Sequence, residues 1–256
     1  MPDPVPLRNA SPEAELRRDL AAAFRWTCRM NWHEGVANHF SVMTGEGKKF
    51  LMNPDKMHFA RIRASDLIEL DADDAETMSR PNAPDATAWG LHGALHRRVA
   101  HARCAIHLHT EYATVLASLA DSRLPPIEQN SAMFWNRHVI DEEFGGLAFE
   151  DEGERVAAML QDLEARIVVM GHHGLLAIGE DVAEAFYAAY YFERAARNYV
   201  LALSTGRPLR VMDDALAEKT AREIWAERAN DGRTPARKHL DELRLILDAE
   251  GDDYAE

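Results

Sequence analysis

Apolar residues recur at steps of three and four along much of the chain, which is the spacing that predicts amphipathic helices. In the longest such stretch, residues 181–203, Asp181 precedes the helix and six residues share one face: Val182, Ala185, Ala189, Phe192, Ala196 and Tyr199. Ser11 and Pro12 open another helix, because a hydroxyl can cap it and proline fits its first turn. The same spacing predicts further helices over residues 85–100, 110–120, 154–165, 213–228 and 235–249.

Shorter apolar segments between these helices predict strands. Residues 38–43 and 48–53 are separated by a Gly-Glu-Gly turn and are predicted to pair as a hairpin. Four more strands are expected, over residues 66–74, 102–110, 166–170 and 174–179. Because strands and helices do not alternate regularly, we expect an α/β fold whose mixed or largely antiparallel sheet lies between helical layers. Residues 11–256 are expected to form one domain, and residues 1–10, with three prolines, a flexible N-terminal arm.

Charge and composition narrow the classes of partner. The 256 residues include 43 acidic and 29 basic side chains, a formal net charge of −14. Neither nucleic acid nor an anionic membrane surface is therefore an expected partner. No apolar run approaches the roughly 18 residues of a membrane span, and the first ten residues lack the pattern of a signal peptide. Two cysteines, Cys28 and Cys104, make no disulfide framework, so we expect a cytoplasmic protein with two reduced, buried thiols.

Histidine is the residue type in clear excess. The chain has 12 histidines, about twice the share expected from average composition. His107 and His109 stand at positions i and i+2 of a predicted strand, so both would project from one face and could bind one divalent ion. His172 and His173 lie in a glycine-bounded turn that can direct one imidazole toward the sheet. Three histidines and an open position suit a catalytic metal, although each pair alone is also compatible with unrelated histidines.

Taken together, these segments resemble the class II aldolase/adducin family. The resemblance extends from about Ser11 to Leu203. It is carried by the H-x-H strand, the later His-Gly of "HHGLLAIG", and the helix "EAFYAAYYFERAARNYVLAL", in which Glu193 matches a family position. It implies a three-layer α/β/α fold on a central mixed, mostly antiparallel sheet. It also implies a homotetramer with active sites between subunits and one divalent metal ion per subunit, most often zinc, with iron, manganese or cobalt as alternatives.

By the same resemblance, the metal ligands are His107, His109 and His173. His172 stands where the family commonly has Asn or His and is expected to be a neighbour of the ligands. His92 is expected on a helix behind the metal strand, where it would support the ligands without binding the ion.

The chain departs from the family pattern at two places. Ala88 occupies the position of the acidic residue that moves protons in family aldolases and epimerases, and a methyl group cannot do so. The positions that hold phosphate in sugar-phosphate aldolases read Asn38-His39, Asp55-Lys56 and Ala86-Thr87. Because a carboxylate such as Asp55 would repel a phosphate dianion, we expect a smaller, non-phosphorylated anion. Its expected substrate-binding residues are Asn38, His39, Asp55 and Thr87, with His58 as a further candidate contact.

Another residue would then have to move the proton. Glu128, in the stretch "LPPIEQNSAMFW" after the metal strand and its helix, is the first candidate, with a surface carboxylate as the alternative. Phe134 and Trp135 could form an apolar wall that raises the pKa of Glu128.

The predicted function is a divalent-metal-dependent lyase. It would cleave a 2-oxo or 2-hydroxy acid by aldol cleavage or decarboxylation, through a metal-stabilised enediolate. One alternative is a non-haem iron oxygenase that cleaves an aromatic 2-oxo or 2-hydroxy acid. Another is an adducin-like interaction protein without enzymatic activity.

Overall fold

The structure, a computed structural model, describes residues 11–45, 47–146, 149–161 and 163–256. Its centre is a seven-stranded sheet with the order β3-β2-β1-β4-β7-β6-β5. The strands are β1 (His39–Met43), β2 (Lys49–Met52), β3 (Ile68–Asp71), β4 (Cys104–Leu108), β5 (His138–Asp141), β6 (Ile167–Met170) and β7 (Gly174–Gly179). All neighbouring strands are antiparallel except β5 and β6, which are parallel. The predicted mixed, mostly antiparallel sheet is confirmed.

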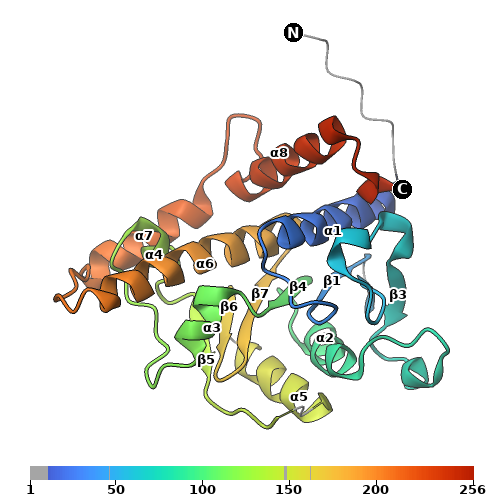
Figure 1. The fold of residues 1–256 in the computed structure, drawn as a ribbon, viewed down its shortest axis with the longest axis horizontal. Helices are drawn as coiled ribbons and strands as arrows, with labels where there is room; N and C mark the ends of the chain where they lie inside the picture. The colour runs from blue at the N-terminus through green and yellow to red at the C-terminus, as the bar shows by residue number, and fades with distance from the viewer. Residues whose placement is uncertain (1–10, 46, 147–148, 162) are drawn as a thin grey trace.

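Helices cover both faces of this sheet (Figure 1). They are α1 (Pro12–Arg29), α2 (Ala86–Arg98), α3 (Glu111–Ala117), α4 (Gln129–Ala132), α5 (Phe149–Leu160), α6 (Val182–Ser204), α7 (Asp214–Ala226) and α8 (Pro235–Glu250). One face packs against α1, α3, α6 and α8, and the other packs against α2 and α5. The three-layer α/β/α arrangement is therefore also confirmed.

The alternation of side chains along β4 decides which residues reach which layer. Ile106 and Leu108 are buried in the core on the α6 side, whereas Ala105 packs with α2 and α5 on the other face. His107 shares the face of Ala105, since residues two apart in a strand point the same way. The buried His107 imidazole is thereby directed toward the layer of α2 and α5.

Several details differ from the sequence prediction. The sequence analysis did not predict the strand β5. This strand has only four residues, three of them half-buried, so it shows neither alternation nor a buried run. The strand β4 ends at Leu108, so His109 is the first residue after it. The predicted arm, residues 1–10, lies outside the described residues. Both cysteines are free thiols, but only Cys104 is buried, because Cys28 lies at the partly exposed end of α1.

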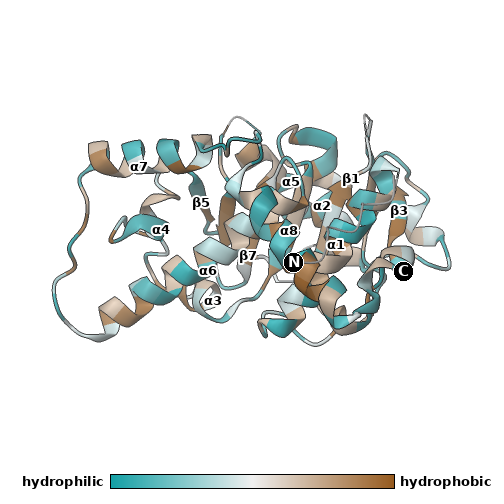
Figure 2. Cartoon of the chain, turned by 90° about the horizontal axis from the view of Figure 1, so that it is seen from above, coloured by the Kyte–Doolittle hydropathy of each residue, from teal (hydrophilic) through white to brown (hydrophobic). Residues whose placement is uncertain are grey.

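The end of α6 and the helix α7 extend past the sheet at one end of the molecule, where Figure 2 shows hydrophobic residues among hydrophilic ones. Four large apolar side chains here are each at least 41% exposed: Leu201, Leu203, Val211 and Leu216. Within the described ranges, no helix combines the length and the apolar character needed to cross a membrane.

Candidate functional site

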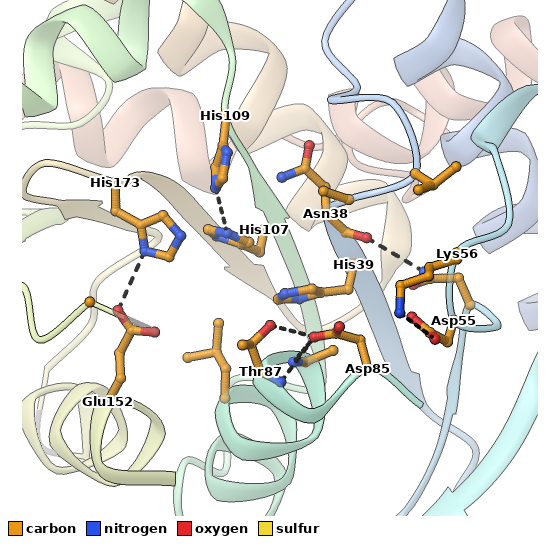
Figure 3. A pocket seen from close by; sticks show the side chains of 16 residues that line it. Asn38, His39, Asp55, Lys56, Asp85, Thr87, His107, His109, Glu152 and His173 are labelled. Atoms are coloured by element: carbon orange, nitrogen blue, oxygen red, sulfur yellow. Dashed lines mark hydrogen bonds and ion pairs between the residues drawn. The ribbon is translucent and has the colours of Figure 1, made fainter. Parts of the chain in front are cut away.

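A cavity of about 370 Å³ lies beside the sheet, at the N-terminal end of α2 (Figure 3). This volume falls in the range of small-molecule sites. Three histidines, His107, His109 and His173, form one wall, and we call them the imidazole wall. The segment around Asn38, residues 55–56 and residues 85–88 form the opposite wall.

The imidazole wall brings together the three predicted ligands. Their ring centroids are 4.7 to 4.9 Å apart in all three pairs. One nitrogen of each ring lies within 4.8 Å of a nitrogen of the other two. The Nε2 atoms of His107 and His109 are only 3.0 Å apart.

Contacts at the other ring nitrogens set the tautomers of two of these histidines. His107 Nδ1 lies 3.1 Å from the carbonyl oxygen of Leu175, and His109 Nδ1 contacts the carboxylate of Glu34. Both oxygens can only accept, so each Nδ1 carries the proton and each Nε2 presents a lone pair. Two lone pairs at 3.0 Å repel unless a cation lies between them, so this donor set fits a divalent metal ion.

Burial keeps the imidazole rings of His107 and His109 neutral. Desolvation lowers the pKa of His107 well below its usual value, and neighbouring histidines lower it further. Desolvation also lowers the pKa of His109, although its contact with Glu34 acts in the opposite direction. Neutral imidazole is the form that binds metals.

Close packing at a glycine positions the third imidazole. His173 lies in the turn between β6 and β7, where its backbone N–H donates to the carbonyl of Met170. A Cβ atom at Gly174 would lie 2.6 Å from the Leu108 carbonyl and 2.7 Å from Cδ2 of His109. Only glycine at 174 allows the turn to approach the end of β4 so closely.

The helix that follows His109 is anchored by a buried carboxylate from α6. Glu193 accepts hydrogen bonds from the Thr110 hydroxyl at 2.6 Å and from the backbone N–H groups of Tyr112 and Ala113 at 2.9 and 2.8 Å. It therefore caps α3 and fixes the backbone directly after His109. Burial raises the pKa of Glu193, and these hydrogen bonds act against that effect.

Glu152 is a cavity residue that the sequence analysis missed. Its carboxylate, 7% exposed, lines the cavity, and Oε1 lies 3.4 Å from Nδ1 of His173. Gly153 makes this placement possible, because a Cβ there would lie 2.1 Å from the carbonyl oxygen of Gly90 on α2. The two helices therefore touch backbone to backbone at this point. Nothing in the local pattern distinguishes Glu152 from a surface acid at the start of a helix.

Asn38 is the most distinctive residue of the opposite wall. Its φ of +73° is in the left-handed region, its side chain is buried, and it lines the cavity. Neither Nδ2 nor Oδ1 has a hydrogen-bond partner among the described residues. A buried amide without partners is costly, so Asn38 is well suited to bind a polar group of a ligand.

The start of α2 carries a negative charge in this wall. The Asp85 carboxylate accepts hydrogen bonds from the backbone N–H groups of Thr87 and Ala88, at 2.9 and 3.2 Å, and from the Thr87 hydroxyl. Burial alone would raise the pKa of Asp85, but these bonds lower it below its usual value. Asp55 also lines the cavity, paired with Lys56 at 3.2 Å.

Behind the cavity runs a buried chain of hydrogen bonds. His39 lines the cavity and stacks on His107 with ring centroids 4.8 Å apart. Its Nδ1 lies 2.8 Å from Nε2 of His92, whose Nδ1 lies 2.5 Å from the Ser41 hydroxyl, and that hydroxyl is 2.7 Å from Nε2 of His96. Desolvation lowers the pKa of His39 to about 3. His92 therefore contacts His39, which in turn stacks on His107 of the imidazole wall.

Three predicted residues, Glu128, Phe134 and Trp135, lie away from the cavity. Glu128 is the N-cap of α4, where its carboxylate accepts from the backbone N–H groups of Asn130 and Ser131. Phe134 is buried against Phe192, and Trp135 lines a separate hollow near Tyr199. These aromatic residues therefore form no wall around the histidines.

His172 and His58 do not line the cavity either. The φ of His172 is +59°, and its exposed side chain lines a different hollow beside Ala117. Its ring lies 6.4 Å from that of Phe144, whose centroid is 5.7 Å from the ring of His173. His58 caps a short 3-10 helix and packs against His33, outside the cavity.

Comparison with known proteins agrees with this architecture. The decarboxylase NovR of Streptomyces niveus is 28% identical over 218 residues, 84% of this chain and 79% of that protein. The 4-hydroxy-3-prenylphenylpyruvate oxygenase/4-hydroxy-3-prenylbenzoate synthase of Streptomyces roseochromogenus subsp. oscitans is 30% identical over 186 residues, 72% of this chain and 65% of that protein.

A solved structure and a family profile cover the same region. An aldolase II superfamily protein from Pseudomonas syringae superimposes with a TM-score of 0.83, covering 97% of this chain and 98% of that one at 27% identity. The profile described as "Class II Aldolase and Adducin N-terminal domain" matches residues 18–200. The chain therefore belongs to the class II aldolase and adducin family.

Proposed function

We propose that the protein is a metal-dependent lyase that cleaves a carbon–carbon bond of a small, non-phosphorylated 2-oxo or 2-hydroxy acid. The observation that carries this proposal is the convergence of three imidazoles on a cavity that also holds the unpartnered amide of Asn38. The first group suits a metal ion and the second a polar substrate. A similarity to a named decarboxylase supports the reaction class.

His107, His109 and His173 would hold the ion. Imidazole ligands suit zinc and also iron, manganese or cobalt. When bound, the ion would attract negative charge that develops on substrate oxygens as the bond breaks. Leu175 and Glu34 would keep two of the ligands in the correct tautomer, through the contacts described above.

The charges of the opposite wall favour a substrate without phosphate. The N–H groups at the start of α2 would otherwise be available to an anion, but the Asp85 carboxylate already occupies two of them. Asp55 adds a second negative charge. Ala88 and Leu91 make the neighbouring surface apolar. A small acid whose carboxylate reaches the imidazole wall fits this distribution better than a sugar phosphate does.

Glu152 is our proposed proton carrier, in place of Glu128. Its buried carboxylate lines the cavity next to His173 and near Ala88, the position where family enzymes carry their acid. Oε1 faces Nδ1 of His173 at 3.4 Å, so the other oxygen is free to hold or move a proton of the substrate. The Glu128 carboxylate is engaged by two backbone N–H groups.

An oxygenase is the second candidate, because one relative is named as an oxygenase. Three histidines would also suit non-haem iron.

We further propose assembly into a closed oligomer such as a homotetramer, supported by the exposed leucines and valine on the end of α6 and near α7. Light scattering would measure the mass, and a stable monomer at micromolar concentration would contradict assembly.

The test of the function combines metal analysis with a substrate screen. Purified protein would be analysed for metals and incubated with 2-oxo and 2-hydroxy acids, with and without phosphate groups, in air and under nitrogen. We expect equal turnover of a free acid in both atmospheres and none by His109→Ala. Turnover only in air would favour the oxygenase. Bound metal without any turnover would favour an interaction protein, and faster turnover of a phosphorylated compound would contradict the assigned substrate class.

A further inference from the structure

A second cluster of metal-binding side chains lies outside the cavity. Cys28, near the end of α1, His33, in the following loop, and His58, after β2, offer one sulfur and two nitrogen atoms within 4.8 Å of one another. The rings of His33 and His58 meet edge to face, with centroids 4.7 Å apart. All three side chains are partly buried.

The backbone folds back on itself to build this cluster. Asn31 has a φ of +57°, and its N–H donates to the carbonyl of Cys28 at 3.0 Å. The next N–H, from Trp32, donates to the carbonyl of Thr27 at 3.0 Å. This reversal at the end of the helix returns His33 to the side of Cys28, although the two are five positions apart.

One buried polar atom of the cluster has no hydrogen-bond partner. Nδ1 of His33 is buried and has no hydrogen-bond partner among the described residues. Cys28 is a free thiol. Desolvation, followed by the neighbouring His58, lowers the pKa of His33, so the ring is neutral near pH 7. A neutral imidazole and a thiol that can lose its proton are suitable ligands for zinc.

We propose that Cys28, His33 and His58 form a second metal site that binds zinc, with a water molecule as the fourth ligand. Tetrahedral zinc places such ligand atoms roughly 3.3 to 3.8 Å apart, so small side-chain rotations would close the present arrangement. Nδ1 of His58 now accepts from the Ala60 N–H at 3.2 Å. Coordination through Nε2 would put the proton on Nδ1 and replace that hydrogen bond by a metal bond.

The position of the cluster suggests what the ion would do. The loop that begins with His33 continues to Glu34, which contacts His109, and to Asn38. The loop that ends with His58 carries Asp55 and Lys56 of the opposite wall. Asn38 and Lys56 both have a positive φ, which is unfavourable for non-glycine residues. An ion at the second site would hold both loops to α1. The proposal of this second site does not depend on the chemistry proposed for the cavity.

Cobalt provides a direct test, because a thiolate bound to Co²⁺ gives a near-ultraviolet charge-transfer band that imidazole ligands do not give. The imidazole wall contains no sulfur, so any such band reports the second site. Metal-free full-length protein would be titrated with Co²⁺ and then with Zn²⁺. We expect two equivalents per chain and a thiolate band. Cys28→Ala and His33→Gln should each bind one equivalent and lose the band.

Matched variants keep the outcome unambiguous. Cys104→Ala removes the other thiol, which is buried in β4, and should keep the band and both equivalents. His109→Ala should keep the band and lose one equivalent. A wild type that binds one equivalent without a band would overturn the second site, as would a band that survives Cys28→Ala. Loss of the band in Cys104→Ala, in protein with an unchanged circular dichroism spectrum, would also overturn it.

Discussion

The two walls of the cavity are built in different ways. The imidazole wall stands on the sheet: His107 is in β4, His109 follows it directly, and His173 lies in the turn between β6 and β7. The opposite wall is formed by loops and by the first turn of α2, and it includes two non-glycine residues with positive φ, Asn38 and Lys56.

The difference separates two tasks. Strand pairing gives the imidazoles little freedom, because β4 and β7 pair along five residues and Leu175 also accepts from His107. Loops can change residue by residue without disturbing the sheet. The imidazole wall therefore suits a function that needs fixed geometry, such as holding an ion, and the opposite wall suits recognition of a particular substrate.

Removing a ligand from the imidazole wall should have the largest effect. His109→Ala leaves two imidazoles of the three, so we expect metal affinity to fall by at least about 100-fold and activity to be lost. Metal content after dialysis measures this. His172→Ala, one residue from a ligand but exposed, is the control and should retain the metal. Equal metal content in wild type and His109→Ala would show that the wall binds no ion.

The proton carrier can be identified by a matched pair of carboxylates. Glu152→Gln keeps the shape of the side chain and removes its proton transfer, so kcat should fall by about 100-fold or more while metal content stays the same. Glu128→Gln replaces one of the two capping oxygens of α4, outside the cavity lining, and should leave kcat unchanged. The assignment fails if Glu128→Gln is the slower enzyme, or if Glu152→Gln turns over normally.

The contact between α2 and α5 can be tested with two glycines. Gly153→Ala would place a Cβ 2.1 Å from the Gly90 carbonyl and force the helices apart. We expect the free energy of unfolding to fall by about 1–3 kcal/mol, with a loss of activity as Glu152 moves. At Gly93, also on α2, the nearest atom is Nη1 at the far end of the long Arg97 side chain, at 3.2 Å. Gly93→Ala should therefore be neutral or stabilise by about 0.5–1 kcal/mol. Denaturant unfolding would compare them, and equal stability would refute the close packing.

The charge of the opposite wall should control discrimination against phosphate. Asp85→Asn keeps a good helix cap but removes the negative charge at the start of α2. Phosphorylated acids should then inhibit about 10-fold more strongly, a change of about 1.4 kcal/mol in binding free energy. Asp73→Asn removes an exposed charge elsewhere and should change nothing. Unchanged inhibition by Asp85→Asn would mean that this carboxylate does not exclude phosphate.

The smallest effect concerns the buried histidines behind the cavity. Desolvation lowers the pKa of His96 to about 3, and the neighbouring Arg103 also lowers it. The folded state therefore binds fewer protons than the unfolded state below pH 6.5, so stability is complete above that pH and falls as the pH decreases toward 3. Each such histidine contributes at most about 1.4 kcal/mol per pH unit.

Metal-free protein unfolded by denaturant at pH 7.5, 6.5 and 5.5 would show this dependence. His96→Gln should reduce the slope between pH 6.5 and 5.5, whereas His172→Gln, at an exposed position, should not. A slope that His96→Gln leaves unchanged would contradict the burial of a neutral imidazole.

Local pattern was sufficient for most of the fold. Two short segments on either side of a Gly-Glu-Gly turn predict the β1–β2 hairpin, and helical spacing predicts α6 within a residue or two of its bounds. β5 could not be predicted in this way because its stability comes from pairing with β6, not from its own four residues. The i, i+2 spacing of His107 and His109 and the glycine-bounded turn at 172–173 indicated a histidine site, and the resemblance to the class II aldolase/adducin family selected His173 as the third member.

The fold class and the histidine-bearing strand and turn could therefore be read from the chain, because strand periodicity and tight turns are local properties, and the family resemblance selected the three imidazoles. The other groups around these imidazoles come from contacts between segments that are distant in sequence. Glu152 reaches the cavity through a contact between two glycines on different helices, and Glu34 reaches His109 through a loop that reverses after α1. Neither contact leaves a periodic trace in the chain. For the same reason Glu128, predicted from its place in sequence, lies at a helix cap, since proximity along the chain does not determine proximity in space.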